Sequence, residues 1–210
     1  KIEVINPSTG KVFATIPDSN AKDVELAIHA AESAFPEWRK LSFEKRFDYL
    51  IAIANGIENR LQEFIEAEST DNGKPTWLAA QSDIPRAISN FKFFAAAQMN
   101  FPSESHMSPG LGLNYTLRQP LGVVGCISPW NLPLYLFSWK IAPALAAGNT
   151  VVAKPSEITP YTAYLLTEVC REIDLPPGVL NVVHGLGSSV GAPIVESARV
   201  KAIAFTGGTS

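Results

Sequence analysis

Residues 120–154 read PLGVVGCISPWNLPLYLFSWKIAPALAAGNTVVAK, and Lys140 is the only charged residue before the last position. By length alone, this run resembles a membrane-spanning segment. Pro129, Pro133 and Pro143 interrupt it, however, and a proline inside a helix or strand removes a backbone hydrogen-bond donor. The pattern therefore predicts a buried strand, a loop, a helix and a second strand, and no transmembrane helix.

The chain beyond this run continues the alternation of apolar runs and helical segments. We predict strands over 123–128, 150–154, 179–184 and 201–206, separated by helices over 134–147, 159–173 and 189–198. This spacing is typical of βαβ units, which form a parallel sheet with helices on both faces. Ligands of such sheets bind beyond the carboxyl ends of the strands, so we expect the functional site in the loops that follow the strands.

The chain before Pro120 has a different, largely helical pattern. Between residues 20 and 98 we expect a first helix capped by Asp18 or Ser19, then helices over 43–60, 61–69 and 76–97, with a loop at 71–75. Residues 101–114 have no helical period, and Tyr115 and Leu117 indicate a short extended arm beside them. The fold class expected from these patterns is α/β, with a helical segment preceding a parallel sheet.

Composition narrows the classes of function. The chain has 210 residues, of which 46% are hydrophobic, so it can bury a core, and its formal net charge of −3 gives no electrostatic footprint for nucleic acid or for a membrane surface. Its two cysteines, Cys126 and Cys170, lie far apart in apolar segments, which favours buried structural thiols and a reducing compartment over a disulfide. Three scattered histidines (His29, His106 and His184) do not predict a metal site.

A glycine-rich motif, Gly185-Leu-Gly187-Ser-Ser-Val-Gly191, follows a predicted strand and opens a predicted helix. Such a turn lets the backbone approach a pyrophosphate, but the third glycine comes one position later than in the G-x-G-x-x-G fingerprint. The acidic residue expected about 20 positions further on is also absent. An ordinary glycine turn between strand and helix therefore remains an alternative.

The same motif contains a literal G-x-S-x-G around Ser189, as in the nucleophile elbow of serine esterases. That fold requires an acid and then a histidine later in the chain, and no histidine follows His184. A serine esterase is therefore only a minor alternative.

Two polar motifs lie at predicted strand ends. Lys154 and Glu157 can hold the two hydroxyls of a ribose, and a carboxylate there favours NAD over NADP; the alternative is a solvated charge pair. In Pro129-Trp130-Asn131-Leu132-Pro133, two prolines fix a loop around Asn131, whose amide can stabilise a developing oxyanion. The alternative for Asn131 is that it merely caps the helix that follows Leu132.

Taken together, several motifs resemble the aldehyde dehydrogenase superfamily in the right order along the whole chain. The similarity covers about the first two-fifths of a family member. It rests on ISPWNLP (127–133), WK (139–140), PALAAGN (143–149), KPSE (154–157), PPGV (176–179), FTGGT (205–209), NPSTG (6–10) and DNGKP (71–75).

This resemblance implies NAD(P)-dependent oxidation of an aldehyde to an acid. In that family a cysteine thiolate attacks the carbonyl, hydride passes to the nicotinamide, and water activated by a glutamate releases the thioester. It also implies a truncated aldehyde dehydrogenase fold with a Rossmann-like parallel sheet. Asn131 is then the oxyanion donor; the residues expected to bind NAD are Ile127, Ser128, Pro129, Trp130, Lys154, Ser156, Glu157, Gly187, Gly191, Phe205, Thr206, Gly207 and Gly208.

The resemblance also implies a division of the chain. We expect an incomplete NAD-binding domain over 1–101 and 121–210, an oligomerisation arm over 102–120 that pairs subunits into a homodimer or homotetramer, and no part of the catalytic cysteine domain. The chain begins at Lys1 without methionine, and we expect the nucleophilic cysteine and the general-base glutamate downstream of Ser210, so the 210 residues alone should not oxidise aldehyde. Gly208 departs from the pattern, because many members have a phosphate-binding serine there.

Further motifs resemble the branch that acts on 2-aminomuconic and 2-hydroxymuconic semialdehydes of tryptophan or aromatic catabolism. Arg86 would then bind the substrate carboxylate with two parallel hydrogen bonds, and the alternative is a plain surface arginine. Leu132, Tyr135 and Trp139 would line the substrate site. The resemblance implies a cytoplasmic enzyme with a small-molecule aldehyde as substrate; a non-catalytic NAD-binding or assembly fragment is the alternative function.

Overall fold

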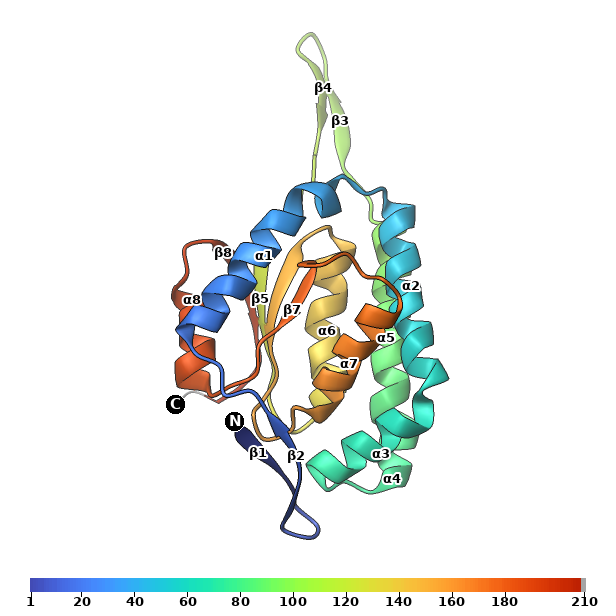
Figure 1. Cartoon of the computed structure of the whole chain (residues 1–210). Helices are drawn as coiled ribbons and strands as arrows, with labels where there is room; N and C mark the ends of the chain where they lie inside the picture. Colours follow the sequence, from blue (N-terminus) through green and yellow to red (C-terminus); the bar gives the residue numbers. More distant parts are fainter. Residues whose placement is uncertain (209–210) are drawn as a thin grey trace.

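The computed structural model describes residues 1–208 and is built around a four-stranded parallel sheet (Figure 1). The strands are β5 (Val123–Ile127), β6 (Thr150–Lys154), β7 (Leu180–Val182) and β8 (Val200–Phe205), in the order β7-β6-β5-β8. All neighbouring strands are parallel, and Ile127 is in register with Lys154 on one side and Phe205 on the other. This register lines up the carboxyl ends of three strands at one edge.

Helices cover both faces of the sheet, as the βαβ spacing predicts. One face packs against α1 (Ala21–Lys40) and α8 (Ala192–Glu196), through apolar residues that include Ile28, Val123, Val152 and Ile194. The other face packs against α6 (Pro133–Ala146) and α7 (Tyr161–Glu172), with α2 (Phe43–Asn59), α3 (Leu61–Asn72) and α5 (Ile84–Met99) outside them. Successive side chains of a strand point to opposite faces of the sheet, so Val123 packs into one core and Val124 into the other.

The helical half differs from the predicted pattern at its boundaries. The cap of α1 is Asn20, not Asp18 or Ser19: its side chain accepts from the Lys22 N–H at 2.8 Å, and Asp23 accepts from the Asn20 N–H at 2.9 Å. Helix α3 extends to Asn72, beyond the predicted end at 69, and stops at Gly73, whose φ of 79° suits a residue without a Cβ. The predicted helix over 76–97 is three pieces: α4 (Thr76–Leu78), a π-helical turn η1 (Ala79–Asp83) and α5.

The sheet half also differs in detail. The predicted strand over 179–184 is reduced to β7, because its ladder with β6 runs only from Leu180 to Val182. The predicted helix over 189–198 is replaced by a π-helical turn η2 (Gly187–Gly191) followed by the short α8, which ends before Ser197.

Two hairpins lie at opposite ends of the molecule. The first, β1 (Ile2–Asn6) with β2 (Lys11–Ile16), lies at the end of the molecule where β8 leads to the C-terminus, and the sequence patterns did not predict it. The second, β3 (Ser105–Ser108) with β4 (Gly112–Tyr115), projects from the other end as an arm (Figure 1). Among residues 1–208, no helix is both long enough and apolar enough to cross a membrane.

Candidate functional site

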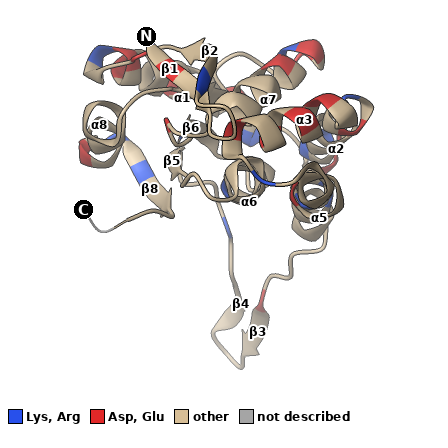
Figure 2. Cartoon of the chain, turned by 90° about the horizontal axis from the view of Figure 1, so that it is seen from below, with Lys and Arg blue, Asp and Glu red and all other residues tan. Residues whose placement is uncertain are grey.

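The carboxyl edge of the sheet brings the predicted motifs together. The Ser128 N–H donates to the Lys154 carbonyl at 3.1 Å, and the Thr206 N–H donates to the Ile127 carbonyl at 3.1 Å. The loops that follow β5, β6 and β8 are therefore joined to one another by backbone hydrogen bonds. Figure 2, seen from this end, shows charged residues mainly on the outer helices, whereas the ribbon around β5 and β6 is largely uncharged.

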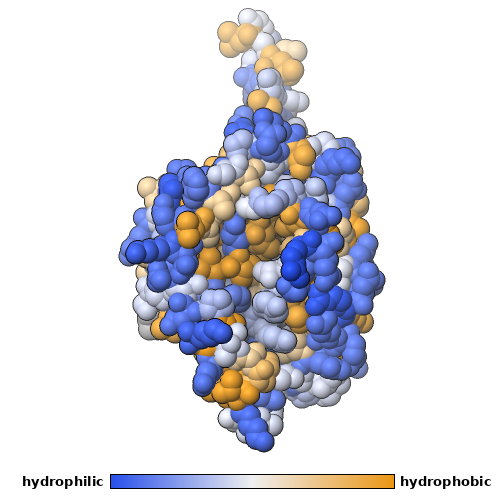
Figure 3. Space-filling view, viewed as in Figure 1, coloured by the Kyte–Doolittle hydropathy of each residue, from blue (hydrophilic) through white to orange (hydrophobic). Residues whose placement is uncertain are grey.

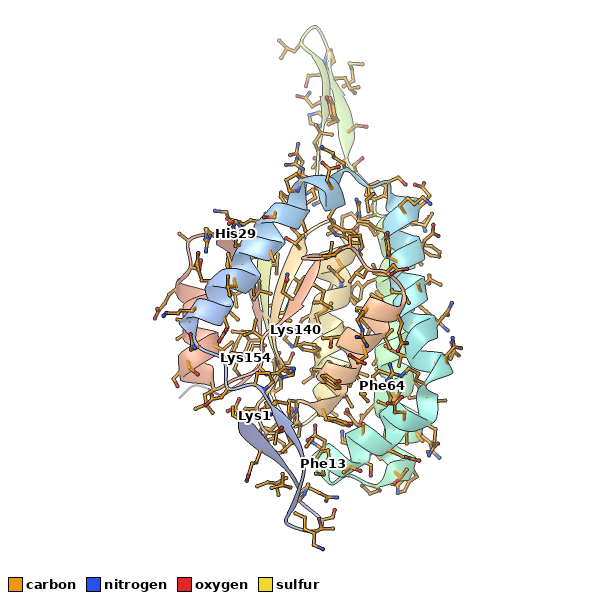
Figure 4. The ribbon with its side chains drawn as sticks, in the orientation of Figure 1. Lys1, Phe13, His29, Phe64, Lys140 and Lys154 are labelled. Carbon is orange, nitrogen blue, oxygen red and sulfur yellow. The ribbon has the colours of Figure 1, made fainter. Side chains whose placement is uncertain are left out.

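Lys154 and Glu157 form an ion pair at this edge. The Lys154 Nζ lies 2.9 Å from Glu157 Oε2 and 3.1 Å from the Pro155 carbonyl, and the lysine is buried (Figure 4). Burial is the largest single effect and raises the pKa of Glu157, but the hydrogen bond from Lys154, a backbone hydrogen bond and the Lys154 charge together hold that pKa below its usual value. Glu157 is therefore a carboxylate whose partly exposed oxygens can accept from a ligand hydroxyl.

The glycine-rich turn lies directly against this pair. A Cβ on Gly191 would stand 3.7 Å from the Lys154 side chain and 4.0 Å from that of Ile127, and the space beside Gly187 is open to 4 Å. The π-helical turn therefore brings Gly187 and Gly191 to the same edge as the β5 and β6 loops. The displaced third glycine of the motif fits this turn, which adds a residue relative to an α-helical start.

The edge suits a dinucleotide. The Ser128 Oγ is buried and has no hydrogen-bond partner within residues 1–208. Ser156 lies on the same loop as Lys154, buried, with its Oγ accepting from the Ile158 N–H at 3.2 Å. On the β8 side Phe205, Thr206, Gly207 and Gly208 are exposed, whereas Thr209, the last residue of that motif, lies outside the described residues.

The loop that carries Asn131 is anchored by its backbone. The Trp130 carbonyl accepts from Asn72 Nδ2 at 2.9 Å and from Thr159 Oγ1 at 3.0 Å. Asn131 is exposed, and its side chain makes no hydrogen bond to the part of the chain that the structure describes. The N-cap of α6 is Leu132, without a side-chain cap, so the alternative that Asn131 caps this helix is wrong.

A buried ion cluster behind this loop was not predicted from the sequence. The Lys74 ammonium contacts Asp83 Oδ2, lies 3.6 Å from Glu68 Oε1 and donates to the Asn131 carbonyl at 3.4 Å. Burial raises the pKa of Glu68 to about 7, although the Lys74 charge and the Thr162 hydroxyl oppose it. Only the DNGKP motif (71–75) indicated this region, and there it predicted a loop.

The expected substrate residues lie on α5 and α6. Arg86 Nε is 3.4 Å from the Tyr135 hydroxyl, and its guanidinium stands 5.7 Å from the centre of the Tyr135 ring. These two residues border a pocket of about 340 Å³, and no acidic side chain within residues 1–208 pairs with Arg86. Tyr135 in turn packs edge-on against Trp139, whereas Leu132 stays at the start of α6 near Asn131.

The other reactive residues are poorly placed for catalysis. Burial raises the pKa of Cys126 to about 12, and that of Cys170 likewise, which confirms them as structural thiols. The Ser189 hydroxyl donates to the Leu186 carbonyl at 3.5 Å, with no histidine among its described partners. His184 is buried, and burial together with the Lys154 charge lowers its pKa to about 4. No cluster of three metal-ligating side chains occurs within the described range 1–208.

Comparison with known proteins places this arrangement in one family. The aldehyde dehydrogenase family model matches residues 1–210. The chain is 48% identical over 210 residues to 2-aminomuconic semialdehyde dehydrogenase from Danio rerio, covering 100% of this chain and 43% of that protein. It is 48% identical over 213 residues to 2-hydroxymuconic semialdehyde dehydrogenase from Pseudomonas sp. (strain CF600), covering 99% of this chain and 44% of that protein.

A solved structure from the same family has the same fold. The NAD+ complex of aldehyde dehydrogenase from Bacillus cereus superposes with a TM-score of 0.96 at 36% identity, covering 99% of this chain and 43% of that one. The chain thus spans less than half the length of these relatives. Because the family model covers every residue and the fold is shared, the resemblance seen in the motifs is confirmed, and the chain belongs to the aldehyde dehydrogenase family.

Proposed function

We propose that the protein takes part in NAD-dependent oxidation of a carboxylate-bearing semialdehyde to the acid. The observation that carries this proposal is the pairing of two features at one edge of the sheet. The Lys154–Glu157 pair follows β6, the Asn131 loop follows β5, and the Ser128 N–H links them by donating to the Lys154 carbonyl. Hydride transfer from an aldehyde-derived carbon requires residues that bind the nucleotide and a nearby amide that donates a hydrogen bond to the developing oxyanion.

In this proposal the edge would hold NAD, which would supply the hydride acceptor. Lys154 and Glu157 would hold the adenosine ribose, Gly187 and Gly191 would border the adenine, and Ile127 to Trp130 with Ser156 would line the groove. Phe205 to Gly208 would contact the pyrophosphate and nicotinamide. The two relatives named above and the NAD+ complex of the Bacillus cereus enzyme support this assignment.

The Asn131 side chain has the role of oxyanion donor. Its exposed amide stands at a strand end on a loop held by two prolines, so it can bind a developing negative charge without reorganising. The nucleophile of this chemistry is not Cys126, because its pKa of about 12 keeps the thiol protonated. We propose that the full-length protein supplies the thiolate and the general-base glutamate from other residues.

Arg86 is the residue that would select substrates carrying a carboxylate. Its guanidinium lies over the Tyr135 ring beside the pocket of about 340 Å³, where a carboxylate can take two of its hydrogen bonds. Leu132 and Trp139 supply apolar walls. Since the relatives are named for 2-aminomuconic and 2-hydroxymuconic semialdehydes, we propose a muconic semialdehyde of tryptophan or aromatic catabolism as the substrate.

The arm over 102–120 is proposed as the oligomerisation element, leaving 1–101 and 121–210 as the NAD-binding domain of a homodimer or homotetramer. We propose a cytoplasmic location, which the two buried, unpaired thiols support. A non-catalytic NAD-binding and assembly unit is the second candidate for the chain by itself. It is favoured by the burial of both cysteines, Cys126 and Cys170.

Steady-state kinetics on the protein from the complete reading frame test this proposal. With NAD and 2-hydroxymuconic semialdehyde, NADH should accumulate, and Arg86→Ala should raise KM for this substrate by about 10- to 100-fold, the equivalent of a lost charged hydrogen-bonding pair. The same variant should change KM for a neutral aldehyde of similar size by less than about threefold. Equal effects on both aldehydes would remove the substrate assignment, and no NADH with any aldehyde would remove the oxidation itself.

A further inference from the structure

The backbone carbonyl of Asn131 has a charged donor from outside its own loop. Lys74 follows α3 by two residues, and its Nζ lies 3.4 Å from this carbonyl. Asn72 and Thr159 hydrogen-bond to the preceding carbonyl, that of Trp130, and so hold the peptide group before Asn131. Among the described residues Lys74 is the side chain that hydrogen-bonds to the carbonyl of Asn131, on the other side of its Cα.

The position of Lys74 is set by two carboxylates that are deeply buried. Its side chain is 7% exposed, whereas those of Glu68 and Asp83 are 0% and 2% exposed. Asp83 is the last residue of the π-helical turn η1, and the extra residue of such a turn rotates everything before it relative to α5. Glu68 is held in turn by the Thr162 hydroxyl at 2.9 Å. The ammonium can therefore move little.

Burying charged side chains in this way costs free energy of folding. Two carboxylates are buried around one ammonium, and Glu68, whose pKa burial raises to about 7, is ionised only in part at neutral pH. A well-packed apolar group in place of such buried charged groups is often no less stable. The cluster does provide a rigid, charged donor at a single backbone atom. Rigid support of this kind is what an oxyanion donor requires, because a displacement of about 1 Å at a reacting centre can cost about 100-fold in rate.

We infer that Lys74, held between Glu68 and Asp83, is a positioning residue for Asn131: it anchors the Asn131 carbonyl and so keeps the side-chain amide where the oxyanion develops. This inference rests on the proposed function for its catalytic consequence. The anchoring of the loop does not depend on that function, and the two parts are measured separately.

The test uses the full-length protein with Lys74→Met combined with Asp83→Asn, which removes one positive and one negative charge; Glu68 loses its ammonium partner but can take up a proton, because burial already raises its pKa to about 7. The matched control is Lys92→Met combined with Glu58→Gln, which removes an exposed ion pair of 2.7 Å from α5 and α2. Hydrogen–deuterium exchange of the peptide over 128–134 should rise by at least about fivefold in the first variant and stay unchanged in the control.

Kinetics show whether the anchor acts through Asn131. The Lys74→Met/Asp83→Asn protein should lose about 10- to 100-fold in kcat, with KM for NAD within about twofold of wild type. Placed on top of Asn131→Ala, the same pair of changes should lower kcat by less than about twofold, because the group it positions is already gone. If this variant does not fold, Lys74→Arg keeps the charge with a wider head group and should give an intermediate loss of kcat.

Each outcome decides one part. Unchanged exchange over 128–134 would overturn the anchoring, and an equal loss of kcat with and without the Asn131 side chain would overturn the positioning role. If the wild-type protein oxidises no aldehyde, the proposed function fails, and the exchange measurement still decides whether Lys74 holds the loop.

Discussion

Among single residues, Glu157 is the one that we propose selects between the two nicotinamide dinucleotides. Its carboxylate stays ionised beside Lys154, and it would repel the additional 2′-phosphate of NADP. Glu157→Gln should therefore lower the ratio of the Kd for NADP to the Kd for NAD by about tenfold, which corresponds to about 1.4 kcal/mol.

Titration of both dinucleotides checks this prediction. Glu168→Gln is the matched control, because Glu168 forms a partly exposed pair with Arg171 on α7. The control should keep the wild-type ratio. A Glu157→Gln protein with the same ratio as wild type would show that this carboxylate does not face the ribose.

The free energy of unfolding should depend on pH through His184, which lies near Lys154. Burial and the nearby Lys154 charge lower its pKa from 6.5 to about 4, so between these values the unfolded chain binds more protons than the folded one. Stability should therefore fall as the pH falls from 6.5 to 4, and this histidine should cost about 2 kcal/mol at pH 5.

The change that tests this linkage is His184→Gln, which cannot be protonated. Denaturant unfolding at pH 7 and pH 5 should show a smaller loss of stability in this variant than in wild type. His29→Gln, on the exposed side of α1, should keep the wild-type loss (Figure 4). A His184→Gln protein with the wild-type slope would place the pH dependence elsewhere.

At the scale of elements, the start of α1 depends on one side chain. The Asn20 side chain accepts from the Lys22 N–H, and the Asp23 side chain accepts from the Asn20 N–H, in a capping box. Asn20→Ala removes one of these bonds and should lower the free energy of unfolding by about 1 kcal/mol, whereas Asn20→Asp should lower it by less than about half of that. Equal losses in both variants, measured by urea unfolding, would show that the cap hydrogen bond does not matter.

The spacing of apolar residues predicted the helices and strands that have a continuous buried row of side chains. Strands β5 and β6 and helices α2 and α6 match the sequence patterns within a few residues, because each has an apolar run bounded by glycine, proline or a polar cap. The π-helical turns η1 and η2 could not be predicted this way, since one extra residue in a single turn is too short a signal for periodicity to detect. The β1–β2 hairpin was missed for a related reason: its strands are largely exposed.

The residues of the candidate site likewise fall into those that the sequence predicted and those that it did not. Motifs at strand ends could be found because a parallel sheet places them at one edge, and the structure joins the loops that follow β5 and β6 through the hydrogen bond from the Ser128 N–H to the Lys154 carbonyl. The residues that hold the Asn131 loop could not be found, because Asn72, Lys74 and Thr159 belong to segments that meet it only in the folded molecule. Their distance in sequence leaves no periodic signal.

At the scale of the whole molecule, the arm is unlike the rest of the surface. Leu111 is 92% exposed, Met107, Leu113 and Tyr115 are also exposed, and hydrophobic residues gather along the projecting hairpin in Figure 3. A hairpin of two strands buries too little to be stable by itself, and its outer edges offer unpaired backbone groups. These features support the proposal that the arm pairs with another subunit.

Charge on the arm tests that proposal. Leu111→Glu combined with Leu113→Glu should shift the sedimentation coefficient toward a smaller assembly, because two charges would be buried in the interface. Val12→Glu combined with Leu26→Glu, at exposed apolar positions outside the arm, should leave the assembly unchanged. An arm variant with the wild-type sedimentation coefficient would exclude the arm from the subunit contact.

Binding of NAD at the carboxyl edge of the sheet, through Lys154 and Glu157, is tested by calorimetric titration of NAD into the full-length protein and into Lys154→Met/Glu157→Gln. This double variant removes the pair without leaving an isolated charge. We expect saturable binding with one site per chain in the wild type and affinity at least about tenfold weaker in the variant. Equal affinity in the two proteins, or no saturable binding in the wild type, would show that the edge does not bind NAD through this pair.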